Sequence, residues 1–181
     1  MNDETEITFK LSWDKLTWGM TMFFVGLMFI LGGGVVWIGI SQLNQGMKLG
    51  IVMLIPGILM ILSIPVVALF APIKYFVDPS FITVWRYGPK IKIPIDNIIE
   101  VQPVELKSVM RTCAMGGAFG SYGWFHCKSL GNFRGYITRN DKTVAIMTVK
   151  GTPFIVSPDD REGFIAAVQS ALAKTKKQIT K

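Results

Sequence analysis

The sequence predicts a membrane protein of the class membrane α plus α+β, in which a two-helix transmembrane hairpin precedes a seven-stranded β-barrel with a C-terminal capping helix. Three observations predict this fold. Between Lys15 and Lys74 the only charged residue is Lys48, the chain after Lys74 consists of short β-branched and aromatic runs, and its last apolar residues have helical spacing. Only 17% of the 181 residues are charged, against about a quarter in soluble domains.

The N-terminal third contains two uncharged blocks, 16–47 and 49–73. A helix needs about 20 apolar residues to cross the hydrocarbon core of a bilayer, so we expect spans over about 17–40 and 49–72. Trp18 and Trp37 are 19 positions apart, which places their rings near the two headgroup levels. The alternative is a pair of buried core helices, but a chain of this length has too little protein to cover both.

The two spans are expected to form a tight hairpin, because the segment 41–48 between them is short and polar. An acidic N-terminus excludes a cleaved signal peptide. Gly32–Gly34 favours close helix packing, and Pro56 and Pro65 should bend the second span before Pro72 ends it. Neither span contains an ionisable residue, which argues against an ion pathway or a proton relay.

Two spans place both termini on one side of the membrane. Six basic residues lie near the spans on that side, whereas the loop carries Lys48 alone; the six are Lys10, Lys15, Lys74, Arg86, Lys90 and Lys92. The positive-inside rule therefore predicts cytoplasmic termini.

From residue 73 the apolar pattern becomes that of short strands, separated by turn residues such as Asp78-Pro79-Ser80. Seven strands are expected, mostly joined as antiparallel hairpins: 73–77, 81–86, 91–95, 98–104, 133–139, 143–149 and 152–156. A long glycine-rich interruption separates the fourth strand from the fifth.

A helix is expected to end the domain, with Ser157 as N-cap and Pro158 at its first position. Its apolar residues recur at helical spacing and form one face. They are Phe164, Ile165, Val168, Ala171 and Leu172. The domain is therefore placed at 74–175, followed by a basic tail, 176–181.

The N-terminal cytoplasmic segment, 1–15, contains a strictly alternating run, 7–13, with Ile7, Phe9, Leu11 and Trp13 on one face. This run could add a strand to an exposed edge of the barrel. A membrane-surface segment and a disordered tail are the alternatives.

The stretch from about Ile73 to Ala173 resembles the bacterial PH-domain (pleckstrin-homology-like) family found in small membrane proteins. The resemblance is carried by the segments 116–125, 130–138 and 155–160. It implies a PH-like barrel with a capping helix, and a multi-pass protein of the bacterial inner (cytoplasmic) membrane with both termini cytoplasmic. The molecular role of the family is undefined, so the resemblance implies fold and location rather than an activity.

The segment 107–128, here called the Gly/aromatic segment, is the main candidate for function. Gly117, Gly120 and Gly123 recur at every third position among aromatic residues. Read as a loop, it could lie on anionic lipid headgroups, form a groove for a protein partner, or simply pack over one end of the barrel. The candidate binding residues are Lys107, Arg111, Phe119, Tyr122, Trp124, Phe125, Lys128 and Arg134.

The charge of the domain suits an anionic surface. From Lys74 onward the chain has 16 basic and 8 acidic residues, a net charge of +8. Eukaryotic pleckstrin-homology domains hold phosphoinositides with basic residues in the first strand connection, but here that connection is Asp78-Pro79-Ser80, without a cation. Membrane lipids and a protein partner are the expected partners. No nucleic-acid recognition motif is present, and the sequence specifies no oligomeric state.

An enzyme is not expected. The only histidine, His126, adjoins Cys127, so a Cys/His pair would need Cys113, with Asp141 or Glu105 as orienting carboxylate. Such a thiol-dependent enzyme is a remote alternative. No cofactor is expected and no metal site, because one His and two Cys lack the usual zinc spacing. The sequence thus favours a membrane-anchored binding module, with an accessory or scaffolding subunit of a larger membrane complex as the alternative.

Overall fold

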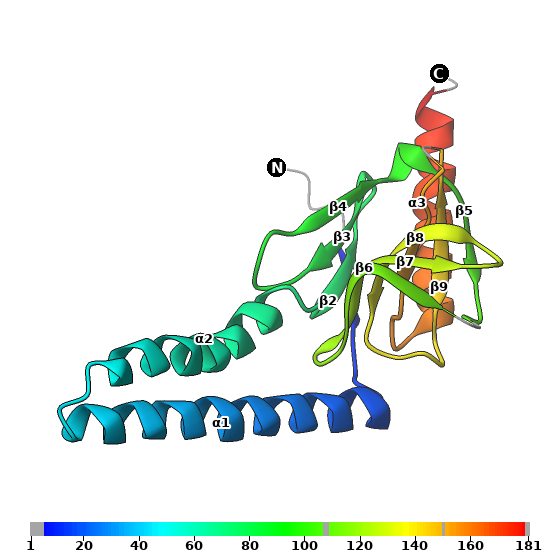
Figure 1. Cartoon of the computed structure of the whole chain (residues 1–181). Coiled ribbons are helices and arrows are strands. Elements are labelled where there is room, and N and C mark those ends of the chain that lie inside the picture. The colour runs from blue at the N-terminus through cyan, green and yellow to red at the C-terminus, as the bar shows by residue number, and fades with distance from the viewer. Residues whose placement is uncertain (1–5, 107–108, 150, 180–181) are drawn as a thin grey trace.

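The computed structural model describes residues 6–106, 109–149 and 151–179 (Figure 1). Two helices, α1 (Lys15–Asn44) and α2 (Leu49–Leu69), form a hairpin that projects from one side of a β-rich domain. The domain ends in a third helix, α3 (Arg161–Ile179). Because α1 is nine residues longer than α2, its first turns continue past the end of α2 and lie beneath the domain.

Both hairpin helices are long and apolar enough to cross a membrane, as the sequence predicts. Their most apolar windows have mean hydropathies of 2.3 and 2.7, and only 11% of the residues in each window are buried. The helix α2 remains helical through Pro56 and Pro65, and it ends three residues before Pro72.

Two reciprocal glycine pairs hold the hairpin together. A Cβ added to Gly57 would lie 2.9 Å from the Gly32 carbonyl oxygen, and one added to Gly50 would lie 2.5 Å from that of Gly39. The helix backbones can approach this closely only because these residues have no side chain. Of the predicted Gly32–Gly34 patch, Gly32 alone makes this contact.

The strands form two sheets. The four-stranded sheet has the order β1 (Ile7–Lys10), β2 (Lys74–Val77), β3 (Phe81–Trp85) and β4 (Ile91–Pro94). The six-stranded sheet has the order β5 (Ile98–Pro103), β9 (Val144–Thr148), β10 (Phe154–Val156), β8 (Gly131–Ile137), β7 (Gly120–Cys127) and β6 (Met110–Gly117). A single 3-10 turn, η1 (Ile95–Asn97), connects β4 to β5.

The prediction of a closed seven-stranded barrel is therefore corrected. All seven predicted strands form, as β2–β5 and β8–β10, but the described part of the domain from residue 74 to 156 has two more, β6 and β7, within the supposed glycine-rich interruption. The two sheets do not close into a barrel. The strands β8 and β9 do not pair with each other, because β10 lies between them, antiparallel to β9 and parallel to β8.

The main hydrophobic core lies between the two sheets and α3. Phe164 and Val168 of α3 are fully buried there with Tyr75 and Ile146. The helix contacts β2, β5 and η1, so it closes the sandwich on one side. Alternate residues of β8 contribute to both faces of its sheet, with Tyr136 in the main core and Phe133 in a second cluster on the opposite face.

The start of the last helix is also corrected. Arg161 is its first residue, and Asp160 caps it by accepting a hydrogen bond from the Gly163 N–H. Ser157 is instead buried in the core. Its Oγ accepts a hydrogen bond from the Thr138 N–H, and its own N–H donates to Tyr75 Oη. The helix continues to Ile179, into the segment expected to be a basic tail.

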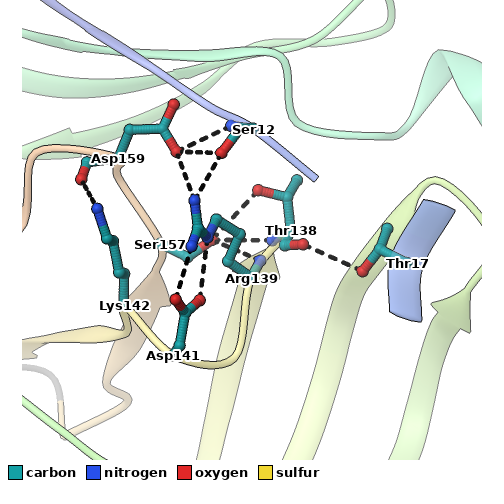
Figure 2. Close-up of polar contacts among 8 residues, drawn as sticks. All are labelled: Ser12, Thr17, Thr138, Arg139, Asp141, Lys142, Ser157 and Asp159. Carbon is teal, nitrogen blue, oxygen red and sulfur yellow. Dashed lines mark hydrogen bonds and ion pairs between the residues drawn. The ribbon is translucent and has the colours of Figure 1, made fainter. Parts of the chain in front are cut away.

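The N-terminal segment is part of the domain. Strand β1 pairs antiparallel with the edge of β2, and Phe9 packs edge-on against Phe164. After it comes a group of paired polar residues, here called the polar clamp: Ser12, Arg139, Asp141 and Asp159 (Figure 2). Asp159 accepts hydrogen bonds from the N–H and the hydroxyl of Ser12, and Arg139 contacts Ser12 and both carboxylates.

The first turns of α1 are tied to the same region. Asp14 caps the helix by accepting from the Thr17 N–H, and Thr17 Oγ1 donates to the Thr138 carbonyl, 3.1 Å away (Figure 2). Hydrogen bonds at both β1 and α1 therefore fix the helix hairpin to the domain.

Candidate functional site

From residue 110 to residue 127, the Gly/aromatic segment is a β-hairpin rather than a loop. Its glycines permit this, because Gly117, Gly120 and Gly123 all have positive φ angles that other residues rarely adopt. A Cβ at Gly123 would lie 2.7 Å from the Ala114 Cα, so the close pairing of β7 with β6 also requires glycine. The outcome is two eight-residue strands whose alternate side chains point to opposite faces.

The tip of this hairpin rests on α1. Phe119 has a φ of 59°, and its N–H donates to Thr21 Oγ1 over 2.8 Å. Its ring packs edge-on against Trp13, with the ring centroids 6.0 Å apart. Phe119 is thus a contact between the domain and the helix hairpin.

Tyr122 joins β7 to the end of α2. Its hydroxyl donates to the Val67 carbonyl oxygen over 2.6 Å, and its side chain is buried. Burial raises the pKa of Tyr122 to about 12, although the nearby positive charge of Arg86 opposes this shift. The phenol therefore stays protonated and keeps its donor at neutral pH.

Phe125 points to the opposite face of β7. It is buried and stacks on Phe133, with the centroids 5.5 Å apart, and it also covers Gly135. Arg111 and Lys128 are exposed, and the Arg111 guanidinium folds over Gly116. Lys107 lies outside the described residues. Arg111, Phe125 and Lys128 are not among the residues that line the pocket described below.

Trp124 and Arg134 are brought together. They are direct neighbours on paired strands, and the guanidinium carbon of Arg134 lies 4.9 Å from the centroid of the Trp124 ring. The same guanidinium lies 6.0 Å from the ring of Phe154, its neighbour on the other side. Arg134 Nε is buried without a hydrogen-bond partner among the described residues.

Tyr122 and Arg134 line a pocket of about 570 Å³, here called the central pocket, within the usual range for ligand sites. It opens between the last turn of α2, the end of β3 and the strands β6–β8. Its walls are mostly apolar, with Val66, Val67 and Phe70 from the helix. Two cations, Arg86 and Arg134, are its charged residues.

Arg86 is a site residue that sequence reasoning counted only as a nearby positive charge. Its guanidinium carbon lies 5.6 Å from the Phe70 ring centroid and 5.9 Å from that of Tyr136, so it bridges the end of α2 and β8. The strand order contains the signal that could have found it. Since β2 leads away from α2, β3 must return, and the residues that follow β3 lie beside the helix end.

The residues considered for catalysis differ in their surroundings. His126 is exposed and its Nδ1 lies 2.8 Å from Asn132 Oδ1. Cys127 is buried in the second cluster, whereas Cys113 is exposed on β6 and lines the central pocket. Within the described ranges, no three His, Cys, Asp or Glu side chains gather as a metal site would require.

Comparison with known proteins agrees with the fold. The family model described as bacterial PH domain matches residues 73–172, which is more than half of the chain. Searches of curated proteins and of solved structures found no match. PH domains are generally non-catalytic modules that bind lipids or proteins. On the strength of that match over strands β2–β10 and α3, this chain belongs to the bacterial PH domain family.

Proposed function

We propose that this protein is a membrane-anchored binding module whose PH domain contacts anionic lipid headgroups on the cytoplasmic face of the bacterial inner membrane. In this proposal α1 and α2 cross the membrane, and both termini are cytoplasmic. The hydropathy of the two helices and the basic residues at their domain end support this orientation.

One contact carries the proposal: the turn between β3 and β4 is hydrogen-bonded to the end of α2. The Gly88 N–H donates to the Leu69 carbonyl oxygen over 2.7 Å. This bond holds Tyr87, whose side chain is 78% exposed, at the level where α2 ends. Tyrosine is favoured at headgroup level because its ring is apolar and its hydroxyl is polar.

Cations accompany Tyr87 at this turn. Lys90 lies over the Trp85 ring, 3.4 Å from its centroid, and Arg86 begins the turn. Each cation close to an anionic leaflet contributes about 1 kcal/mol of attraction. The turn between β2 and β3, with Ser80, is at the other end of β3 and serves as the natural control.

Cysteine accessibility in the full-length protein tests this arrangement. In a background with Cys113→Ser and Cys127→Ser, we expect Tyr87→Cys to react more slowly with a water-soluble maleimide in nanodiscs containing phosphatidylglycerol than in phosphatidylcholine nanodiscs. Ser80→Cys should react equally in both. In whole cells, an impermeant maleimide should label Gln45→Cys from outside and leave Ser80→Cys unlabelled.

Two results would contradict the proposal. Labelling of Ser80→Cys from outside the cell would reverse the topology. Equal labelling of Tyr87→Cys in the two kinds of nanodisc would remove the headgroup contact.

An accessory or scaffolding subunit of a membrane complex is the second candidate, favoured by the outer edge of β6. This strand is at the end of its sheet and exposes Met110 and Met115, at 69% and 45%. An edge strand with exposed methionines suits strand addition by a protein partner. Purified protein in nanodiscs separates the two candidates, since a lipid-dependent response at Tyr87 needs no second protein.

A further inference from the structure

The central pocket shares lining residues with two neighbouring pockets. An apolar pocket of about 240 Å³ shares Val67 and Met115 with it and lies against α1. A distal pocket of about 280 Å³ shares Arg134 with it and lies between β4 and the strands β7, β8 and β10. We call the three together the inter-sheet groove.

Polarity rises along the inter-sheet groove with distance from the helices. The apolar pocket is lined by Phe23, Phe24 and Leu27 and contains no charged residue. The central pocket adds Arg86 and Arg134. The distal pocket adds Lys92 together with hydroxyl and amide groups, those of Thr148, Thr152 and Asn97. This is the order of groups in an amphiphile, from hydrocarbon chain to polar head.

The charges of the groove are all of one sign. Among the residues that line its three pockets there are Arg86, Arg134 and Lys92 but no Asp or Glu. Within the described part of the chain, Arg134 forms no ion pair, and its buried Nε has no hydrogen-bond partner. The positive charge of Arg134 therefore has no carboxylate partner among the described residues, and a bound anion would supply one.

We infer that the inter-sheet groove binds one anionic phospholipid. Its phosphate contacts Arg86 and Arg134, an acyl chain occupies the apolar pocket beside α1 and α2, and the remainder of the headgroup extends toward Lys92. Guanidinium groups suit this role because they bind phosphate oxygens through two parallel hydrogen bonds. The inference rests on the proposed function, since the membrane next to α2 supplies the lipid.

Cys113 offers a direct readout of occupancy. It lines the central pocket and is exposed, whereas Cys127 is 1% exposed and serves as an internal control. The full-length protein in a neutral maltoside detergent is titrated with lysophosphatidylglycerol, and the alkylation rate of Cys113 is followed by mass spectrometry. Lysophosphatidylcholine and glycerol phosphate are titrated in parallel.

We expect lysophosphatidylglycerol to protect Cys113, and the other two compounds to protect it little at the same concentrations. Arg134→Gln and Arg86→Gln should each raise the half-protecting concentration about tenfold, as loss of a hydrogen bond to a charged group predicts. Lys174→Gln removes an exposed cation of α3 outside the groove and should leave protection unchanged. Unchanged near-ultraviolet circular dichroism establishes that each variant is folded, and Arg134→Lys should retain part of the protection.

Three results would overturn the inference. Equal protection by lysophosphatidylcholine would show that charge is not recognised, and equal protection by glycerol phosphate would show a site for free anions. Unchanged protection in the double variant Arg86→Gln, Arg134→Gln would exclude the arginines. If Tyr87→Cys still responds to lipid composition in nanodiscs, these results refute the groove and leave the proposed function intact.

Discussion

Arg134 and Arg139 are five residues apart, yet their surroundings differ in kind. Arg139 belongs to the polar clamp, where it pairs with Asp141 and Asp159 and donates to Ser12 (Figure 2). The hydrogen bonds that Arg139 donates to Asp141 raise the pKa of Arg139, and the same bonds lower the pKa of Asp141. Arg134 lies on aromatic rings in the inter-sheet groove, and the described residues supply no carboxylate to it.

The difference separates a closed side of the domain from an open one. On the closed side, α3 and β1 cover the core, and the residues of the polar clamp form hydrogen bonds and ion pairs with one another. On the open side, a pocket lies between β4 and the strands β7 and β8, and Lys92 and Arg134 lie against aromatic rings. Structural roles therefore concentrate on the closed side, and the capacity to bind a ligand remains on the open side.

The largest expected effect comes from breaking the closed side. Phe164→Ala removes a fully buried ring that contacts Phe9 and Tyr75. We expect it to lower the free energy of unfolding by about 3–5 kcal/mol, as large-to-small changes of aromatic core residues do. Denaturant unfolding of the full-length protein in detergent measures this. Trp124→Ala on the open side, where the ring is 40% exposed, should cost much less, and equal costs would contradict the distinction.

Substitution of Arg139 and of Arg134 should change the free energy of unfolding by less, but it compares the two sides of the domain more directly. Arg139→Gln should lower the free energy of unfolding by about 1–2 kcal/mol, because it removes charged hydrogen bonds that are partly exposed to solvent. Arg134→Gln should be neutral to within about 0.5 kcal/mol, since no ion pair is lost. The same unfolding measurement compares them, and a greater loss for Arg134→Gln would show that Arg134 is structural.

A further effect is expected at alkaline pH and concerns two buried tyrosines. Burial raises the pKa of Tyr122 to about 12, and it raises that of Tyr75 as well. The folded state therefore holds these protons more tightly than the unfolded state, whose tyrosines titrate near pH 10. Their contribution to stability is complete below about pH 10 and is lost as pH rises toward 12.

Unfolding curves at pH 8 to 11.5 measure this loss, and Tyr122→Phe should reduce its pH dependence. This variant also removes the hydrogen bond to Val67, at a cost of about 1 kcal/mol at neutral pH. A pH dependence identical to that of the unmodified protein would assign the effect to other groups.

Much of the fold could be predicted from local sequence. The two uncharged blocks predict α1 and α2, and the β-branched runs predict seven of the strands, because burial and β-propensity act over a few neighbouring residues. The strands β6 and β7 were missed since glycines such as Gly120 and Gly123 are typical of loops. Here they are in strands that pair too closely for side chains.

The arrangement of the sheets and the site depended on contacts distant in sequence. That β10 lies between β8 and β9 cannot be read from the order of the strands. Ser157 is a residue type that favours helix N-caps, but here it is hydrogen-bonded to Tyr75 and α3 begins at Arg161. Tyr122, Trp124 and Arg134 were singled out from the sequence, whereas Arg86 joins them only through the fold.

The glycine pairs of the hairpin have a mechanical consequence. Gly32 and Gly39 are seven residues apart, as are Gly50 and Gly57, so the two close backbone approaches lie two helical turns apart. Sliding one helix along the other would therefore separate both glycine pairs at once. The close contacts therefore favour tilting or rotation of α1 and α2 as one unit over sliding of one helix along the other.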